Sequence, residues 1–127
     1  MSALPKSVGA ITLFCDDLRR SQAFYEGVFD VEAIHEDDDS VAFRFDNTIV
    51  NLLKAQAAHE LIDPAVVAHP GAGSSFQLTI WVADADAACA LLAERDVELL
   101  NGPIDRAWGR RTAAFADPDG HVWEVAQ

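Results

Sequence analysis

The stretch Ala10-Ile-Thr-Leu-Phe-Cys-Asp-Asp17 decides the fold, because the chain repeats it 67 positions later as Gln77-Leu-Thr-Ile-Trp-Val-Ala-Asp84. Each copy is a run of β-branched, aromatic and other apolar residues that closes on an aspartate, which is typical of a strand. Apolar residues at helical spacing follow each copy, over 18–29 and 85–94. A repeat at a nearly fixed offset, with matched elements, indicates duplication of one structural unit.

Each unit continues with further strands. A short apolar segment leads in each case to a pair of strands that meet at a turn, Asp46-Asn47 in the first unit and Asp117-Pro-Asp-Gly120 in the second. We therefore predict an α+β fold of two β-α-β-β-β units that form a curved, cleft-bearing mixed sheet. The expected strands are 31–34, 41–45 and 48–53 in the first unit, and 96–100, 110–116 and 121–126 in the second.

The length of 127 residues predicts a single domain, 1–127, with unit one at 7–54 and unit two at 74–127. The stretch 55–73 is rich in alanine and contains Pro64 and Pro70. It is expected to be a linker with one short helical turn at 64–67.

The composition narrows the range of partners. Twenty-one acidic against nine basic residues give a net charge of −12, so no nucleic-acid partner is expected, because such binding needs Lys and Arg to neutralise phosphates. No apolar run approaches the length of a membrane span, and the segment 1–6 lacks the apolar core of a secretory signal. We expect a cytoplasmic protein without a membrane partner. The charge itself favours solubility or, as the sharper alternative, attraction of a cationic ligand.

Strand alternation predicts which side chains share a face. If Ile11, Leu13 and Cys15 pack under the first helix, the residues between them face away, and the same holds for the second copy. A face of this kind, apolar and aromatic with a few polar groups, is typical of small-ligand sites. Its aromatic side chains would either contact a ligand or fill the core between the units. The residues expected on it are Ala10, Thr12, Phe14, Asn51, Gln77, Thr79, Trp81 and Glu124.

Three segments, 17–25, Trp108-Gly-Arg110 and 117–124, resemble the vicinal oxygen chelate superfamily, and the likeness covers nearly the whole chain. This superfamily includes glyoxalases, extradiol dioxygenases, fosfomycin-resistance enzymes and bleomycin-resistance proteins. The resemblance implies the α+β fold described above and a homodimer. It is specific for the fold, whereas one fold of this group supports several chemistries.

The resemblance also implies four metal-ligand positions, which in this sequence are Ala10, Asn51, Gln77 and Glu124. Alanine cannot ligate a metal, and Asn51 and Gln77 offer only neutral amide oxygens. A divalent site usually needs three or four good donors. No cofactor is therefore expected, and a divalent metal at Glu124 is the alternative. His121 is interpreted as a residue at the exit of a turn rather than as a ligand.

The leading functional prediction is metal-free binding of a small organic molecule, in the manner of bleomycin-resistance proteins, with sequestration of a cationic antibiotic as its specific form. Stacking and cation–π contacts with aromatic side chains suit such a ligand. The alternative is a lyase, isomerase or dioxygenase of glyoxalase type, with Glu124 as base or in a degenerate metal site. Glu124 would meet a ligand cation or pair with Arg110 or Arg111. The predicted ligand-binding residues are Thr12, Phe14, Asn51, Gln77, Thr79, Trp81, Trp108, Arg110 and Glu124.

Overall fold

The computed structural model describes residues 3–127 as two successive β-α-β-β-β units, which confirms the predicted α+β fold. Met1 and Ser2 lie outside the described residues, although the predicted domain and the segment 1–6 include them. The first unit contains β1 (Ala10–Cys15), α1 (Leu18–Phe29), β2 (Ala33–Glu36), β3 (Ser40–Arg44) and β4 (Ile49–Lys54). The second contains β5 (Gln77–Trp81), α3 (Ala85–Glu94), β6 (Leu99–Asp105), β7 (Arg111–Ala116) and β8 (Val122–Ala126).

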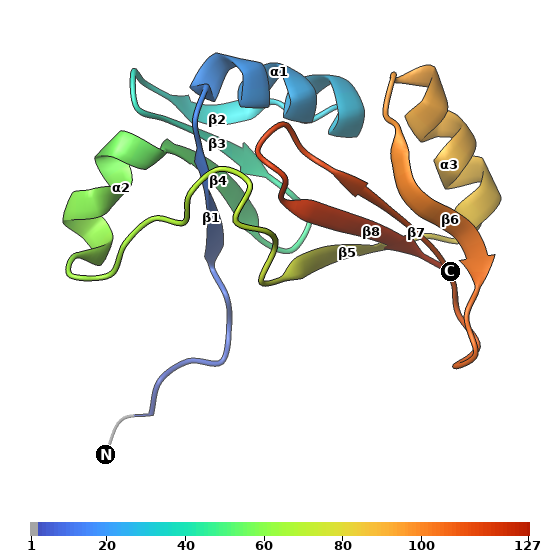
Figure 1. Ribbon diagram of the computed structural model, residues 1–127. Helices are drawn as coiled ribbons and strands as arrows, with labels where there is room; N and C mark the ends of the chain where they lie inside the picture. Colours follow the sequence, from blue (N-terminus) through green and yellow to red (C-terminus); the bar gives the residue numbers. More distant parts are fainter. Residues whose placement is uncertain (1–2) are drawn as a thin grey trace.

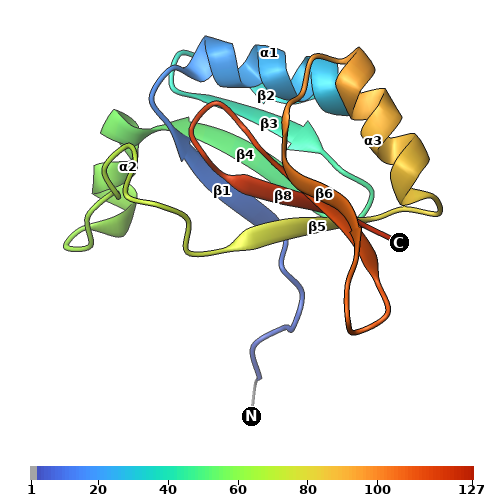
Figure 2. The same ribbon diagram turned by 45° about the vertical axis from the view of Figure 1, so that its right-hand side comes forward.

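The strands form two four-stranded mixed sheets with matching topology, β1-β4-β3-β2 and β5-β8-β7-β6. In each sheet the first and last strands of the unit pair in parallel, and the other pairs are antiparallel. The duplication extends to the register, because Thr12 lies opposite Asn51 in the first sheet and Thr79 lies opposite Glu124 in the second. Figures 1 and 2 show α1 and α3 on the same side of the two sheets.

Each of these two helices begins at the aspartate that closes its strand. The Asp17 carboxylate accepts a hydrogen bond from the Arg20 backbone N–H at 3.1 Å, and the Asp84 carboxylate accepts one from Ala87 at 3.0 Å. These bonds satisfy backbone donors that the first helical turn leaves without a partner. The structure therefore begins and ends both helices at the predicted residues.

Aromatic side chains from both units share one core. Tyr25 and Phe29 of α1 pack against Trp123 of β8, with ring centroids 5.9 Å and 4.8 Å apart. Phe29 also lies 6.1 Å from Phe115 of β7. Tyr25 and Phe115 are fully buried, so the two units meet in a buried core and not at an exposed surface.

The stretch 55–73 differs from the prediction. A third helix, α2 (Ala55–Ile62), occupies its first part, whereas Pro64 lies in a turn and 66–67 has no regular structure. Alanine has the highest helix propensity, and the side chain of Ala58 is completely buried. Residues 55–62 of the predicted linker thus form a helix. The predicted helical turn at 64–67 is wrong.

None of the helices in residues 3–127 has the length and apolar character needed to cross a bilayer.

Candidate functional site

The side of the second sheet that faces away from α3 is exposed to solvent along β5, and we call it the open face. Gln77 and Trp81 on this side are exposed, and 68% of the surface of Trp81 is accessible, while Leu78 and Ile80 of the same strand pack against the core. Strand alternation therefore places the β5 side chains as predicted. Of the two interpretations of Trp81, its exposure rules out a place in the core between the units.

Glu124 projects from β8 onto the same open side. Its carboxylate is half-buried and accepts a hydrogen bond from the hydroxyl of Thr79 at 3.0 Å, directly across the strand pair. The ion pair that the sequence allowed with Arg110 or Arg111 is not formed within residues 3–127. The two arginines that could have neutralised Glu124 have other partners.

Arg111 points to the helix side, where its guanidinium pairs with Asp86 at 2.9 Å and with Asp105 at 3.1 Å. These carboxylates raise the pKa of Arg111. Arg110 lies on the open side, with its guanidinium carbon 5.0 Å from the centre of the Trp81 ring. This distance is typical of a cation–π contact.

Arg106 was missed in the sequence, although it borders the same face. Its Nε donates to the Thr112 hydroxyl at 2.9 Å and its Nη2 donates to the Asn101 side-chain oxygen at 2.8 Å. No sequence signal indicated it, because Arg106 follows β6, whose pairing register shifts on both sides of Asn101. Thr112 is only 3% exposed because Arg106 lies against it.

The corresponding face of the first sheet carries a weaker polar pair. The Asn51 amide donates to the Thr12 hydroxyl at 3.5 Å, Ala10 is exposed and Phe14 is half-buried. Within residues 3–127, no hydrogen bond joins this pair to Glu124. Four predicted residues thus form two separate pairs, Thr12 with Asn51 and Thr79 with Glu124. Trp108 is 72% exposed and lies in the hairpin between β6 and β7.

The four metal-ligand positions of the family do not fit a divalent ion in this chain. Ala10 has no donor atom, and the side chains of Asn51 and Gln77 are neutral amides. Glu124 alone is a carboxylate, and one of its oxygens already accepts the bond from Thr79. This donor set is short of the three or four strong ligands that such a site needs.

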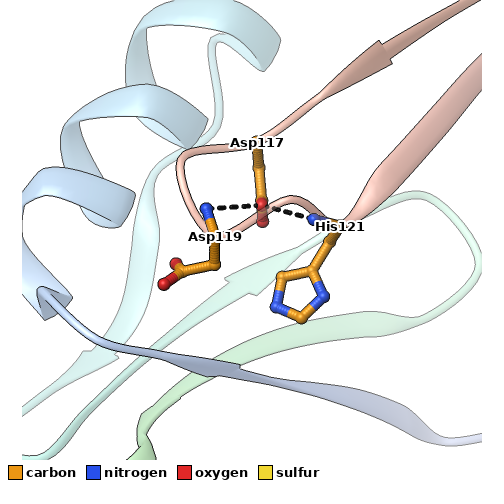
Figure 3. Close-up of side chains that lie close together, drawn as sticks. All are labelled: Asp117, Asp119 and His121. Atoms are coloured by element: carbon orange, nitrogen blue, oxygen red, sulfur yellow. Dashed lines mark hydrogen bonds between the residues drawn. The ribbon is translucent and has the colours of Figure 1, made fainter. Parts of the chain in front are cut away.

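A second cluster, Asp117, Asp119 and His121, has ligand atoms within 4.8 Å of one another (Figure 3). Its atoms already have partners in the protein. One oxygen of Asp117 accepts the backbone N–H groups of Asp119 and His121 at 3.0 and 2.8 Å, and the other accepts the Tyr25 hydroxyl at 2.6 Å. Both bonds to the backbone are typical of a turn closed by its first aspartate.

The other two residues of the cluster, Asp119 and His121, form hydrogen bonds with the first unit. The two oxygens of Asp119 accept the Asp16 backbone N–H at 2.8 Å and the Ser21 hydroxyl at 2.7 Å. His121 Nε2 lies 2.8 Å from the carbonyl oxygen of Phe14, so this nitrogen carries the proton. We call residues 117–121 the inter-unit turn. The prediction that His121 lies at a turn exit is confirmed, and its contact with β1 is new.

Two cavities of the described residues take in little of the predicted site. A cavity of about 230 Å³ at the β6–β7 hairpin includes one predicted residue, Arg110, among its lining residues. A more open one of about 480 Å³ lies beside α2 and contains none of the predicted residues. The lining residues are Asp105, Arg106, Gly109, Arg110, Arg111 and Gln127 for the first, and Asp39, Gln56, Ala57, His59, Glu60 and Asp63 for the second.

Solved structures with this architecture support the fold assignment. A glyoxalase/bleomycin resistance protein/dioxygenase from Nocardioides superposes with a TM-score of 0.88 at 22% identity, covering 98% of this chain and 85% of that chain. Lactoylglutathione lyase from Agrobacterium tumefaciens gives a TM-score of 0.76 at 21% identity, covering 97% and 94%. A protein of unknown function from Agrobacterium tumefaciens str. C58 gives 0.76 at 26% identity, covering 99% and 95%.

Identities this low, near one residue in four or below, show the likeness of fold and carry no activity across. No curated protein matches the sequence. The family model of the Glyoxalase/Bleomycin resistance protein/Dioxygenase superfamily, however, matches residues 7–125, which include both units from β1 to β8. With the duplicated topology already established, this match means that the chain belongs to the glyoxalase/bleomycin resistance protein/dioxygenase superfamily.

Proposed function

We propose that this protein binds a small organic molecule on the open face of its second sheet, without a metal, and that Glu124 meets a cationic group of the ligand. The observation that carries the proposal is the environment of Glu124. The carboxylate is half-buried, its hydrogen-bond partner is a neutral hydroxyl, and no cation of residues 3–127 pairs with it. A partly desolvated carboxylate of this kind gains from a cationic partner.

Trp81 supplies an apolar surface next to this charge. It lies two residues from Thr79 on the same strand face, about 7 Å along β5. Arg110 stacks on the ring, yet 68% of Trp81 stays exposed, which leaves a surface for an aromatic ligand. The net charge of −12 adds a long-range attraction for cations. Cationic aromatic antibiotics of the bleomycin class combine these features, so their sequestration is the specific form of the proposal.

Titration of the wild-type protein with a panel of cationic aromatic compounds, bleomycin included, tests this function. Glu124→Gln keeps the shape of the side chain and removes its charge, so it should weaken binding by about 1–3 kcal/mol. Trp81→Ala should weaken binding as well. Glu98→Gln, at an exposed position after α3, removes the same charge elsewhere and should bind like wild type.

The same titration separates binding from catalysis. If Glu124 were the base of a glyoxalase-type enzyme, Glu124→Gln would lose turnover while ligand affinity changed little. Binding of no panel member by the wild type, or equal binding by both variants and the wild type, would overturn the proposal.

A further inference from the structure

The hairpin end of the open face carries two arginines that no carboxylate neutralises. Within residues 3–127, Arg106 and Arg110 form no ion pair, in a chain with twenty-one acidic and nine basic residues. The partners of Arg106 are a hydroxyl and an amide oxygen, and Arg110 rests on the Trp81 ring. Both residues line the cavity of about 230 Å³, and its one carboxylate, that of Asp105, pairs with Arg111. Their charge is thus free to act on a ligand.

The register shows how these arginines relate to the proposed ligand site. Trp81, Ala126 and Thr112 form one row across β5, β8 and β7. Arg110 contacts Trp81 and Arg106 contacts Thr112 of this row, and both arginines line one cavity. The neighbouring row is Thr79, Glu124 and Ala114.

Rows of one strand face lie about 7 Å apart. The open face therefore presents a negative group and a positive pair at neighbouring rows, with an exposed aromatic ring beside them.

We propose that the ligand also carries a carboxylate, which binds Arg110 and Arg106 in the cavity that both residues line, while an aromatic ring lies against Trp81. This inference rests on the proposed function, since it assigns the second charged end of the same ligand. A planar guanidinium suits a carboxylate, to which it donates two parallel hydrogen bonds. A monoanion is favoured over a dianionic phosphate, because the net charge of −12 repels each added negative charge. The ligand class is then an aromatic amino acid in the broad sense, with its amine and carboxylate at opposite ends.

A matched pair of probes tests this assignment. 4-(Aminomethyl)benzoate has both charges across one ring, and 4-(aminomethyl)benzamide differs only in lacking the negative one. The benzoate should bind wild-type protein on the order of tenfold more tightly than the amide, as expected for one charge-assisted contact. Arg110→Gln and Arg106→Gln should each remove this preference. Arg20→Gln, an exposed arginine on α1, should keep it.

Arg110 is exposed, so its variant should fold whatever the effect of replacing the half-buried Arg106. Equal affinity of wild type for the two probes, or a preference that persists in Arg110→Gln, would overturn the inference. If the cationic panel binds and the benzoate does not, the inference falls and the proposed function stands. If neither binds, both fall.

Discussion

Among single residues, Tyr25 of the first unit makes the buried hydrogen bonds that connect its helix to the second unit. The Tyr25 hydroxyl accepts a hydrogen bond from Trp123 Nε1 at 3.0 Å and donates one to Asp117 at 2.6 Å, and all three side chains are buried. Burial raises the pKa of the Asp117 carboxyl, and the bond from Tyr25 acts in the opposite direction. The hydroxyl thus connects β8 and the inter-unit turn to α1.

Tyr25→Phe should lower the free energy of unfolding by about 1–3 kcal/mol, because it leaves the Trp123 N–H and one Asp117 oxygen without their buried partner. The loss should grow as the pH rises from the ordinary titration range of an aspartate toward neutrality. Without the Tyr25 bond, the pKa of Asp117 in the folded state rises further. A carboxyl whose pKa is raised in the folded state lowers the free energy of unfolding as the pH rises, because the folded protein must then hold a poorly solvated charge. The pKa is raised further in the variant, so its stability falls more than that of the wild type.

Urea unfolding of both proteins across this pH range measures the difference. A Tyr25→Phe loss below a few tenths of a kcal/mol, or one that shrinks as pH rises, would contradict the role given to this hydroxyl.

At the scale of elements, local signals explain what could be predicted. The aspartate caps and the apolar spacing defined α1 and α3, and period-two alternation placed Thr79, Trp81 and Glu124 on one face. α2 was missed because its alanines were read together with the prolines that follow it. Such signals act over a few residues.

Contacts between distant segments left no comparable trace in the sequence. His121 reaches the backbone of Phe14 across 107 positions, and nothing in the pattern around either residue indicates the partner. Arg106 follows β6, whose register shifts near Gly102, so simple alternation along that strand fails before the arginine is reached.

Gly102 offers a test at this scale. Its φ is +87°, and an added Cβ would lie 2.4 Å from the Thr112 carbonyl oxygen and 2.8 Å from the Ala113 Cα, both backbone atoms of β7. Gly102→Ala should therefore lower the free energy of unfolding by roughly 1–3 kcal/mol. Gly27, inside α1, has open space at its Cβ position, so Gly27→Ala should raise it by about 0.5–1 kcal/mol.

Thermal or urea unfolding of the two variants compares them directly. Equal stability of the two alanine variants would show that the close approach of β6 to β7 is not a constraint on the fold.

At the scale of the whole molecule, the two units share a core on the helix side and leave large apolar side chains exposed elsewhere. Trp81, Ile104 and Trp108 are 68%, 42% and 72% exposed, all on or near the open face of the second sheet. Exposed apolar groups gathered in one region are typical of a surface that contacts a partner. We expect the partner to be a second copy of the chain, related by two-fold symmetry.

Light scattering at micromolar protein concentration and moderate salt should give the mass of a dimer, twice 13.8 kDa. A monomer under these conditions would contradict the predicted homodimer.

The claim that ligand binding here needs no metal is tested most directly by elemental analysis of the purified protein after mild dialysis. The donor set of Asn51, Gln77 and Glu124, with alanine at the fourth position, predicts far less than one transition-metal ion per chain. About one Zn, Ni, Mn or Fe ion per chain, lost in Glu124→Gln, would contradict the claim and favour an enzyme with a metal at this glutamate.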